Sequence, residues 1–179
     1  NDELSDTIDA LTFGNILHES MEELYKPLLK RANPNAEIER LANRDTIAAA
    51  VDNTMCRLLM NSRKVSSEEF SGDMLLVRDI IIKYIQRGIM RYDIANEGYT
   101  IAGLEKDVDW QCPISNGRMV NLSGRADRID RRADGSLQII DYKSGNTPHL
   151  EYNGMEALFR GGAQERVSNI FQTMLYSMI

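Results

Sequence analysis

The 179-residue sequence predicts an α/β (α+β) fold with helices in its first half and a small sheet in its second half. Apolar residues recur at helical spacing up to about residue 97, and a strand-like pattern replaces them afterwards. Two turn signals, Asn116-Gly117 and Asp134-Gly135, separate three strand-like segments. We therefore expect a small mixed sheet with an antiparallel meander flanked by helices.

Apolar spacing predicts three helices in the first half of the chain. The first helix has Thr12 as its candidate cap, and Pro27 predicts that it kinks or ends early. The second helix is expected over residues 36–61. The third is expected to run from a cap at residues 66–69 to about Ala95.

Residues 98–179 are expected to form the sheet core and a final helix. The expected strands cover residues 99–112, 119–130 and 137–143, and the helix runs from about residue 163 or 168 to the end. The chain begins without an initiator Met and ends in an apolar run. We therefore expect residues 1–179 to be a single domain, with residues 1–97 as its helical part, taken from a longer protein.

Composition limits the classes of protein to consider. The net charge is −6, which argues mildly against a module that binds nucleic acid mainly through a basic surface. Two cysteines, Cys56 and Cys112, fit a reducing compartment and are too few for a disulfide framework. No run of 18 apolar residues is present, so we expect a cytoplasmic protein without a membrane span.

Asp141 directly follows an apolar strand, where strand propensity and burial both disfavour a carboxylate. A two-residue turn before this strand would place Asp127 and Asp141 on opposite faces of the sheet. A three-residue loop instead pairs Asp127 with Asp141 and Ile129 with Ile139. The two carboxylates then lie side by side, and Lys143 leaves the strand on the same face.

Two adjacent carboxylates repel each other unless one is protonated or a cation binds both. Two acids and a lysine suit phosphodiester hydrolysis, since the acids can hold Mg²⁺ or Mn²⁺ and the lysine can act on the attacking water. The same residues also fit a simple ion pair between Asp141 and Lys143 on an edge strand. Basic residues surround the two acids, either as part of the site or as ordinary surface side chains: Arg118, Arg125, Arg128, Arg131, Arg132 and Lys143.

Four motifs occur in a fixed order and span most of the chain. They are G-N-I-L-H at residues 14–18, G-R-A-D-R-I-D at 124–130, D-Y-K-S-G at 141–145 and Q-T-M-L-Y at 172–176. This set resembles the RecB/AddB branch of the PD-(D/E)XK nuclease superfamily. The resemblance implies a restriction-endonuclease-like core and a magnesium-dependent deoxyribonuclease, exo- or endonucleolytic, that belongs to a helicase–nuclease of recombination or repair.

The resemblance also implies roles for single residues. The implied metal ligands are His18, Glu105, Asp127, Asp141 and the backbone carbonyl of Tyr142. The implied catalytic residues are Asp127, Asp141, Lys143, Gln172 and Tyr176. Asp107 and Asp109 share the strand parity of Glu105 and are alternatives to it. His18 also fits a half-buried structural histidine, and Tyr176 also fits a packing residue of the last helix.

The sequence departs from the family in its cysteines. Some members carry a four-cysteine iron–sulfur cluster, with one cysteine before the core and three after it. Cys56 and Cys112 do not fit that layout, so this chain does not support a cluster. The chain also lacks a phosphate-binding G-x-x-x-x-G-K-[ST] loop, so any helicase would be another domain or a partner.

Two alternatives to a DNA nuclease remain open at this point. One is a catalytically inactive copy of the fold that binds DNA or contacts another protein chain. The other is a metal-dependent phosphohydrolase that acts on small nucleotides. A broad basic groove around the site would favour DNA, whereas a closed pocket would favour a small nucleotide.

Overall fold

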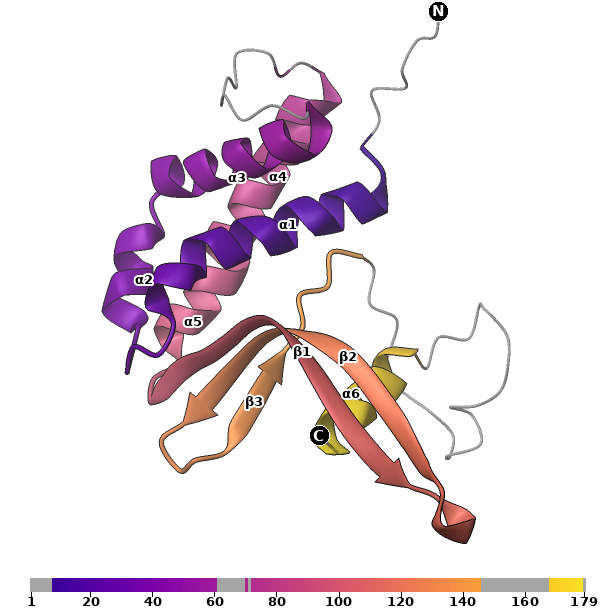
Figure 1. The fold of residues 1–179 in the computed structure, drawn as a ribbon. Coiled ribbons are helices and arrows are strands. Elements are labelled where there is room, and N and C mark those ends of the chain that lie inside the picture. Colours follow the sequence, from indigo (N-terminus) through magenta and orange to yellow (C-terminus); the bar gives the residue numbers. More distant parts are fainter. Residues whose placement is uncertain (1–7, 61–69, 71, 146–167, 179) are drawn as a thin grey trace, which may run out of the picture.

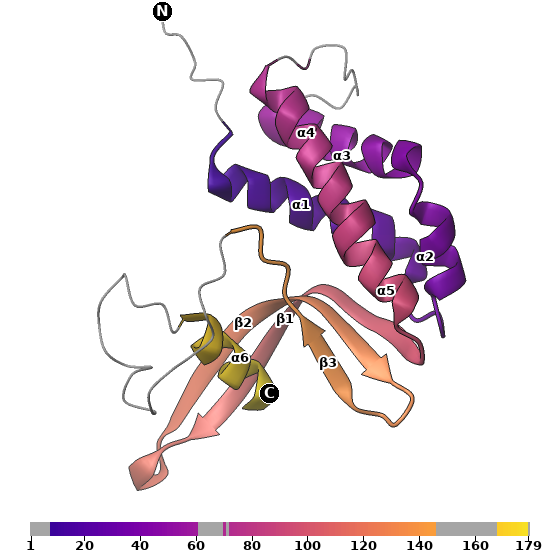
Figure 2. The same cartoon turned by 180° about the vertical axis from the view of Figure 1, so that it is seen from behind.

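The computed structural model describes residues 8–60, 70, 72–145 and 168–178. Helices occupy the first half, three strands follow, and a helix comes last, so the expected α/β class is confirmed. The helices of residues 10–95 gather at one end of the sheet, and the helix of residues 168–178 lies beside the second strand (Figures 1 and 2). In the described part of the chain, no helix is long and apolar enough to cross a membrane.

The first helix, α1, spans Ala10–Tyr25. The expectation that Thr12 caps it is wrong, because the Asp9 side chain accepts a hydrogen bond of 2.7 Å from the Thr12 backbone nitrogen. Pro27 lies in a 3₁₀ turn over Lys26–Leu28, so it marks the end of the helix rather than a kink within it.

The single helix expected over residues 36–61 is two helices, α2 at Asn35–Leu41 and α3 at Arg44–Leu59. Asn43 causes the break, because its side chain accepts a hydrogen bond of 2.8 Å from the Thr46 backbone nitrogen and so caps α3.

The third helical segment contains a π-helical turn that the sequence pattern does not show. Helix α4 spans Asp73–Tyr84, the π turn covers Ile85–Met90, and α5 spans Arg91–Ala95. The expected end at Ala95 is confirmed. The expected cap at residues 66–69 lies outside the described residues.

The sheet is an antiparallel meander in the order β1-β2-β3. Strand β1 spans Tyr99–Pro113, β2 spans Met119–Arg132 and β3 spans Leu137–Ile140. Ile129 pairs with Ile139, which confirms the register of the three-residue loop. Beyond the part that β3 covers, β1 and β2 continue together as a long two-stranded arm (Figure 1).

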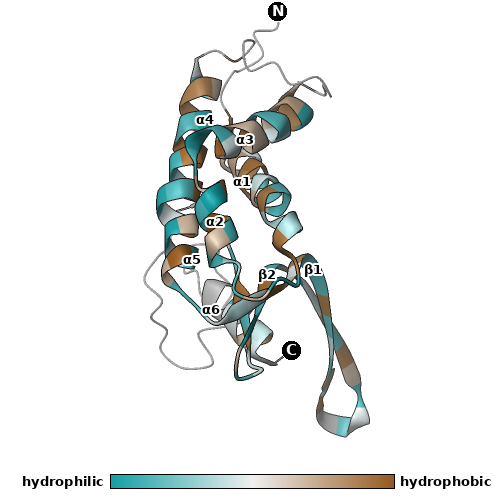
Figure 3. Cartoon of the chain, turned by 90° about the vertical axis from the view of Figure 1, so that its left-hand side faces the viewer, coloured by the Kyte–Doolittle hydropathy of each residue, from teal (hydrophilic) through white to brown (hydrophobic). Residues whose placement is uncertain are grey.

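One hydrophobic core joins the helices to the start of the sheet. It takes Ile16, Leu17, Met21 and Leu24 from α1, Ile47, Val51 and Met55 from α3, Ile81 and Ile82 from α4, and Tyr99 and Ile101 from β1. Figure 3 shows hydrophobic and hydrophilic stretches alternating along these helices, as expected where each buries one side. Tyr142, just after β3, belongs to the same core. The last helix, α6 at Ser168–Met178, lies beside β2.

Asn43→Ala is expected to lower the free energy of unfolding by about 1 kcal/mol, because α3 loses the side chain that satisfies its first turn. Thermal or denaturant unfolding measures this change. Asn43→Asp keeps a capping oxygen and serves as the matched control. Equal losses in both variants would show that the capping bond is not what Asn43 contributes.

Candidate functional site

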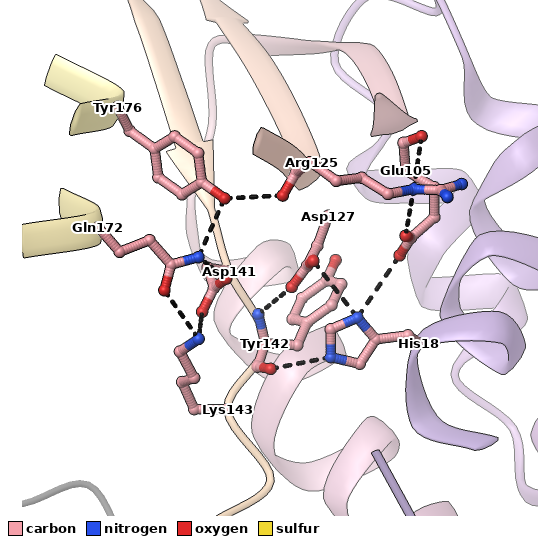
Figure 4. A network of polar contacts seen from close by, with 9 residues as sticks. All are labelled: His18, Glu105, Arg125, Asp127, Asp141, Tyr142, Lys143, Gln172 and Tyr176. Carbon is pink, nitrogen blue, oxygen red and sulfur yellow. Dashed lines mark hydrogen bonds and ion pairs between the residues drawn. The ribbon is translucent and has the colours of Figure 1, made fainter. Parts of the chain in front are cut away.

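His18, from the middle of α1, faces two carboxylates of the sheet (Figure 4). Its Nδ1 atom lies 3.3 Å from Asp127 Oδ1 and 3.5 Å from Glu105 Oε1. Its Nε2 atom lies 3.0 Å from the backbone carbonyl oxygen of Tyr142. Ligand atoms of His18, Glu105 and Asp127 all lie within 4.8 Å of one another.

The surroundings of His18 determine which ring nitrogen carries a proton. A carbonyl oxygen can only accept, so Nε2 carries a hydrogen and donates it to Tyr142. Nδ1 then meets two acceptors, which requires a second proton or a cation at that position. The hydrogen bond to Asp127 is the main cause that raises the pKa of His18, and burial opposes it only in part.

Glu105 occupies an unusual backbone position next to this imidazole. Its φ angle is 44°, in the left-handed region that non-glycine residues rarely adopt, and such a conformation costs on the order of 1–3 kcal/mol. Burial raises the pKa of Glu105, and the nearby Asp127 raises it further. Arg125 partly offsets this, with its Nε atom 3.2 Å from Glu105 Oε2. Asp107 and Asp109, the alternatives from strand parity, are exposed.

Asp141 and Lys143 form a second group with α6. Lys143 Nζ lies 2.6 Å from Asp141 Oδ2. The Gln172 amide donates to Asp141 Oδ1 at 3.0 Å, and its oxygen accepts from Lys143 Nζ at 3.1 Å. Tyr176 accepts from Gln172 Nε2 at 3.0 Å and donates to the carbonyl oxygen of Arg125 at 2.7 Å. Gln172 therefore holds the acid and the lysine of the D-Y-K motif together (Figure 4).

Tyr142 lies between the His18 group and the Asp141–Lys143 group, which share no side chain. The Tyr142 backbone nitrogen donates to Asp127 Oδ2 at 2.6 Å, so Asp127 contacts the residue that follows Asp141. Extending the β2–β3 register by one pair aligns Asp127 with Asp141, although the paired strand ends at Ile140. The group of close ligand atoms found among the described residues leaves Asp141 out, and its carboxylate contacts Lys143 instead.

The residues present fit a divalent cation. An imidazole nitrogen and two carboxylates form a mixed donor set that hard or borderline divalent ions accept. Glu105 and Asp127 carry like charges, and among the described residues the ion pairs that balance them come from the His18 ring and Arg125. Each cysteine is free, and neither belongs to this group: Cys56 is buried in α3 and Cys112 is near the end of β1.

Comparison with known proteins decides the family. The sequence model of the PD-(D/E)XK nuclease superfamily matches residues 1–179. The chain belongs to the PD-(D/E)XK nuclease superfamily. Nucleases of this superfamily use divalent metal ions, which agrees with the donor set around His18.

The curated relatives of this PD-(D/E)XK chain are much longer proteins. Three of them are named as one subunit of an ATP-dependent helicase/deoxyribonuclease. The relative from Thermoanaerobacter sp. (strain X514) is 27% identical over 78% of this chain and 13% of its own length. The relative from Clostridium tetani is 29% identical over 74% of this chain and 12% of its own length. The relative from Clostridium botulinum (strain Loch Maree / Type A3) is 32% identical over 61% of this chain and 9% of its own length. The chain thus spans only a small part of the relatives it matches.

A cleft of about 1070 Å³ opens in front of the His18 group. It follows α1 from Ala10 to Pro27, a path of roughly 25 Å at the helical rise. Its charged walls are mixed, with acidic residues Glu19, Glu22, Glu23 and Glu105 and basic residues Lys26, Arg57, Arg125 and Lys143. The cleft is therefore neither a broad basic groove nor a small closed pocket.

The structure also shows residues that the sequence patterns did not single out. Arg128 was grouped with possible surface arginines, yet its side chain is 1% exposed. The sequence held one signal of this burial: Arg128 and Asp130 are two residues apart on a strand, so their side chains lie on the same face and can pair. Tyr84 of α4 donates from its hydroxyl to the carbonyl oxygen of Lys143 at 3.0 Å, and no sequence signal linked these two residues.

Mn²⁺ binding to the His18 group is expected to weaken as the pH falls below neutrality and to release protons. The pKa values of His18 and Glu105 are both raised, so both groups hold protons at a pH where ordinary carboxylates have lost them, and those protons compete with the cation. Calorimetry in buffers of different ionisation enthalpy measures the affinity and the protons released.

Two variants control the Mn²⁺ measurement. Asp127→Asn should remove Mn²⁺ binding. Asp107→Asn changes an exposed residue on the same strand as Glu105 and should leave Mn²⁺ binding unchanged. Binding that is independent of pH and survives Asp127→Asn would place the metal elsewhere.

Proposed function

We propose that this chain is a Mg²⁺- or Mn²⁺-dependent deoxyribonuclease, with residues 1–179 forming one nuclease domain of a helicase–nuclease. The observation that carries the proposal is the His18–Glu105–Asp127 group directly beside the Asp141–Lys143–Gln172 group. The first group supplies ligands for a cation, and the second presents a lysine ammonium next to it. Family membership and the names of the relatives support a nuclease of the repair type.

The roles proposed for the residues follow from their contacts. His18, Asp127 and Glu105 would hold the cation. The Tyr142 carbonyl and the Asp141 carboxylate are proposed as further ligands, which would exchange their contacts with His18 Nε2 and Lys143 for the cation. A bound divalent cation would supply an activated water and neutralise charge on the scissile phosphate.

Lys143 is proposed to act on the attacking water and on the charge that develops at the phosphate. Its ammonium is fixed by Asp141 and by Gln172, so it requires little reorganisation before the reaction. Tyr176 holds Gln172 and is itself bonded to the backbone of Arg125 on β2. Gln172 and Tyr176 therefore position the lysine against the sheet that carries Asp127.

DNA is favoured over a small nucleotide by the shape of the cleft. A cleft that follows α1 for roughly 25 Å is longer than a mononucleotide needs, and it crosses the candidate metal group at His18. The relatives are named as helicase/deoxyribonuclease subunits, which makes a helicase, as a domain or a separate chain, the expected partner. Exonuclease and endonuclease action both remain compatible with this cleft.

Lys143→Ala is expected to lower DNA cleavage by about 10²–10³-fold, because its interaction strengthens in the transition state. DNA binding, measured in Ca²⁺ to prevent turnover, should change by less than about tenfold, since one phosphate contact is lost. A nuclease assay on single- and double-stranded DNA, with and without Mg²⁺, measures the first quantity. Lys83→Ala removes an exposed lysine of α4 as the matched control.

Two results would contradict the proposed enzyme. A wild-type chain that binds DNA but never cleaves it with Mg²⁺ or Mn²⁺ would favour an inactive DNA-binding copy of the fold. Cleavage of free nucleotides without cleavage of DNA would favour the small-nucleotide phosphohydrolase. The same assay should be repeated with the full-length protein, because the relatives are several times longer than this chain.

A further inference from the structure

Arg128 lies in a charged cluster that is almost completely buried. Its side chain is 1% exposed, and the side chains of Asp93 and Asp130 are each 2% exposed. Arg128 Nε lies 2.8 Å from Asp130 Oδ1, and Nη2 lies 2.6 Å from Asp130 Oδ2. Nη1 lies 2.7 Å from Asp93 Oδ2. The guanidinium therefore joins a strand residue to a residue of helix α5.

Two tyrosines enclose the guanidinium of Arg128. Its Cζ atom lies 5.2 Å from the centre of the Tyr25 ring and 5.3 Å from the centre of the Tyr99 ring, within the range of cation–π contacts. The Tyr25 hydroxyl donates to Asp93 Oδ2 at 2.6 Å. Tyr25 is thus fixed at its ring by Arg128 and at its hydroxyl by Asp93.

Tyr25 and His18 are on the same helix and the same side of it. They are seven residues apart on α1, which is two turns and about 10 Å. The sheet therefore meets α1 at two points, through Asp127 at His18 and through Arg128 at Tyr25. Asp127 and Arg128 are consecutive residues of β2, so one short segment of the strand makes both contacts.

We propose that Arg128 is a positioning residue of the nuclease site, which sets helix α1 on strand β2 so that His18 meets Asp127. Asp93 and Tyr25 complete this link, because they join α5 and α1 to the same guanidinium. The expected effect of Arg128 on DNA cleavage rests on the proposed function. The expected effect of Arg128 on the contact between His18 and Asp127 does not depend on whether the chain cleaves DNA.

A cluster that only stabilises the fold is the competing explanation. The helical part contains a matched case in Asp52 and Arg78, which form a two-point ion pair with Arg78 Nε on Asp52 Oδ1 and Nη2 on Asp52 Oδ2. The side chains of this pair are 10% and 20% exposed, and neither residue contacts the site. A loss of stability without a change at the site is what Asp52→Asn should produce.

The test compares Asp93→Asn with Asp52→Asn in the 179-residue chain. Each variant removes one carboxylate charge from an ion pair with arginine and keeps the size of the side chain. Both should lower the temperature of unfolding. Asp93→Asn should also weaken Mn²⁺ binding by about tenfold or more, the usual effect of losing a residue that orients a metal ligand. Asp52→Asn should leave the Mn²⁺ affinity unchanged.

A second readout follows His18 directly without metal or DNA. The ring signals of His18 in NMR spectra should shift in Asp93→Asn and remain as in wild type in Asp52→Asn. The sequence has one other histidine, His149, so the two sets of signals can be assigned by a single substitution. Cleavage should fall in Asp93→Asn at low Mn²⁺ and recover in part as Mn²⁺ is raised.

If Asp93→Asn fails to fold, Tyr25→Phe gives the deciding measurement. This variant removes one hydroxyl and keeps the Arg128–Asp93 contact, and we expect about fivefold weaker Mn²⁺ binding with a shifted His18 signal. A folded Asp93→Asn or Tyr25→Phe variant with wild-type Mn²⁺ affinity and wild-type His18 signals would overturn the proposal. A wild-type chain that binds Mn²⁺ but does not cleave DNA would contradict the proposed function and leave the positioning role measurable.

Discussion

Burial of the Arg128 guanidinium constrains how the two halves of this protein meet. Removing an ion from water costs several kcal/mol, and only a complete set of partners offsets that cost. Asp130 supplies two contacts from β2, Asp93 supplies one from α5, and two aromatic rings close the remaining faces. Moving the helices away from the sheet would separate Asp93 from the buried guanidinium.

The π-helical turn over Ile85–Met90 helps to bring Asp93 to the Arg128 guanidinium. A π turn adds one residue to the helical ladder and so rotates the residues that follow by roughly 100° relative to an uninterrupted α-helix. Asp93 follows this turn and faces Arg128. The π turn is therefore part of how the helical half presents a carboxylate to the sheet.

The candidate site lies next to the Arg128 cluster, since Asp127 and Arg128 are consecutive residues of β2. Asp127 and Glu105 lie close together beside one imidazole, and Glu105 accepts an unfavourable backbone conformation at this point. Burial, and then the nearby Asp127 carboxylate, raises the pKa of Glu105, and the two acids leave a place in the cleft where a cation would be stabilised. The Arg128 cluster is buried between helices and sheet, whereas the His18 group opens onto the cleft.

Much of this arrangement could be predicted from the sequence, because strand register depends on local turn chemistry. The three-residue loop before β3 fixed the pairing of Ile129 with Ile139, and the apolar pattern gave the strands to within a few residues. The ion pair between Asp141 and Lys143, one of the two interpretations of these residues, is present in the structure, and Gln172 contacts both of them.

What could not be predicted depends on contacts between distant segments. The break at Asn43 competes with a continuous apolar pattern, and a single side-chain cap decides it. Arg128 resembles its exposed neighbours in sequence, and only the approach of Asp93 and Tyr25 makes its burial possible. Glu105 was the first candidate from the resemblance, but strand parity left Asp107 and Asp109 open, because the left-handed φ of Glu105 is invisible to strand parity.

We propose that one helix residue, His18, and two sheet residues, Glu105 and Asp127, together form a divalent-metal site. The most direct test is anomalous diffraction from crystals grown with Mn²⁺. A peak in contact with His18, Asp127 and Glu105 is the predicted result. A fully occupied peak on other acidic residues of the cleft, such as Glu19 or Glu22, with none at His18, would contradict the claim.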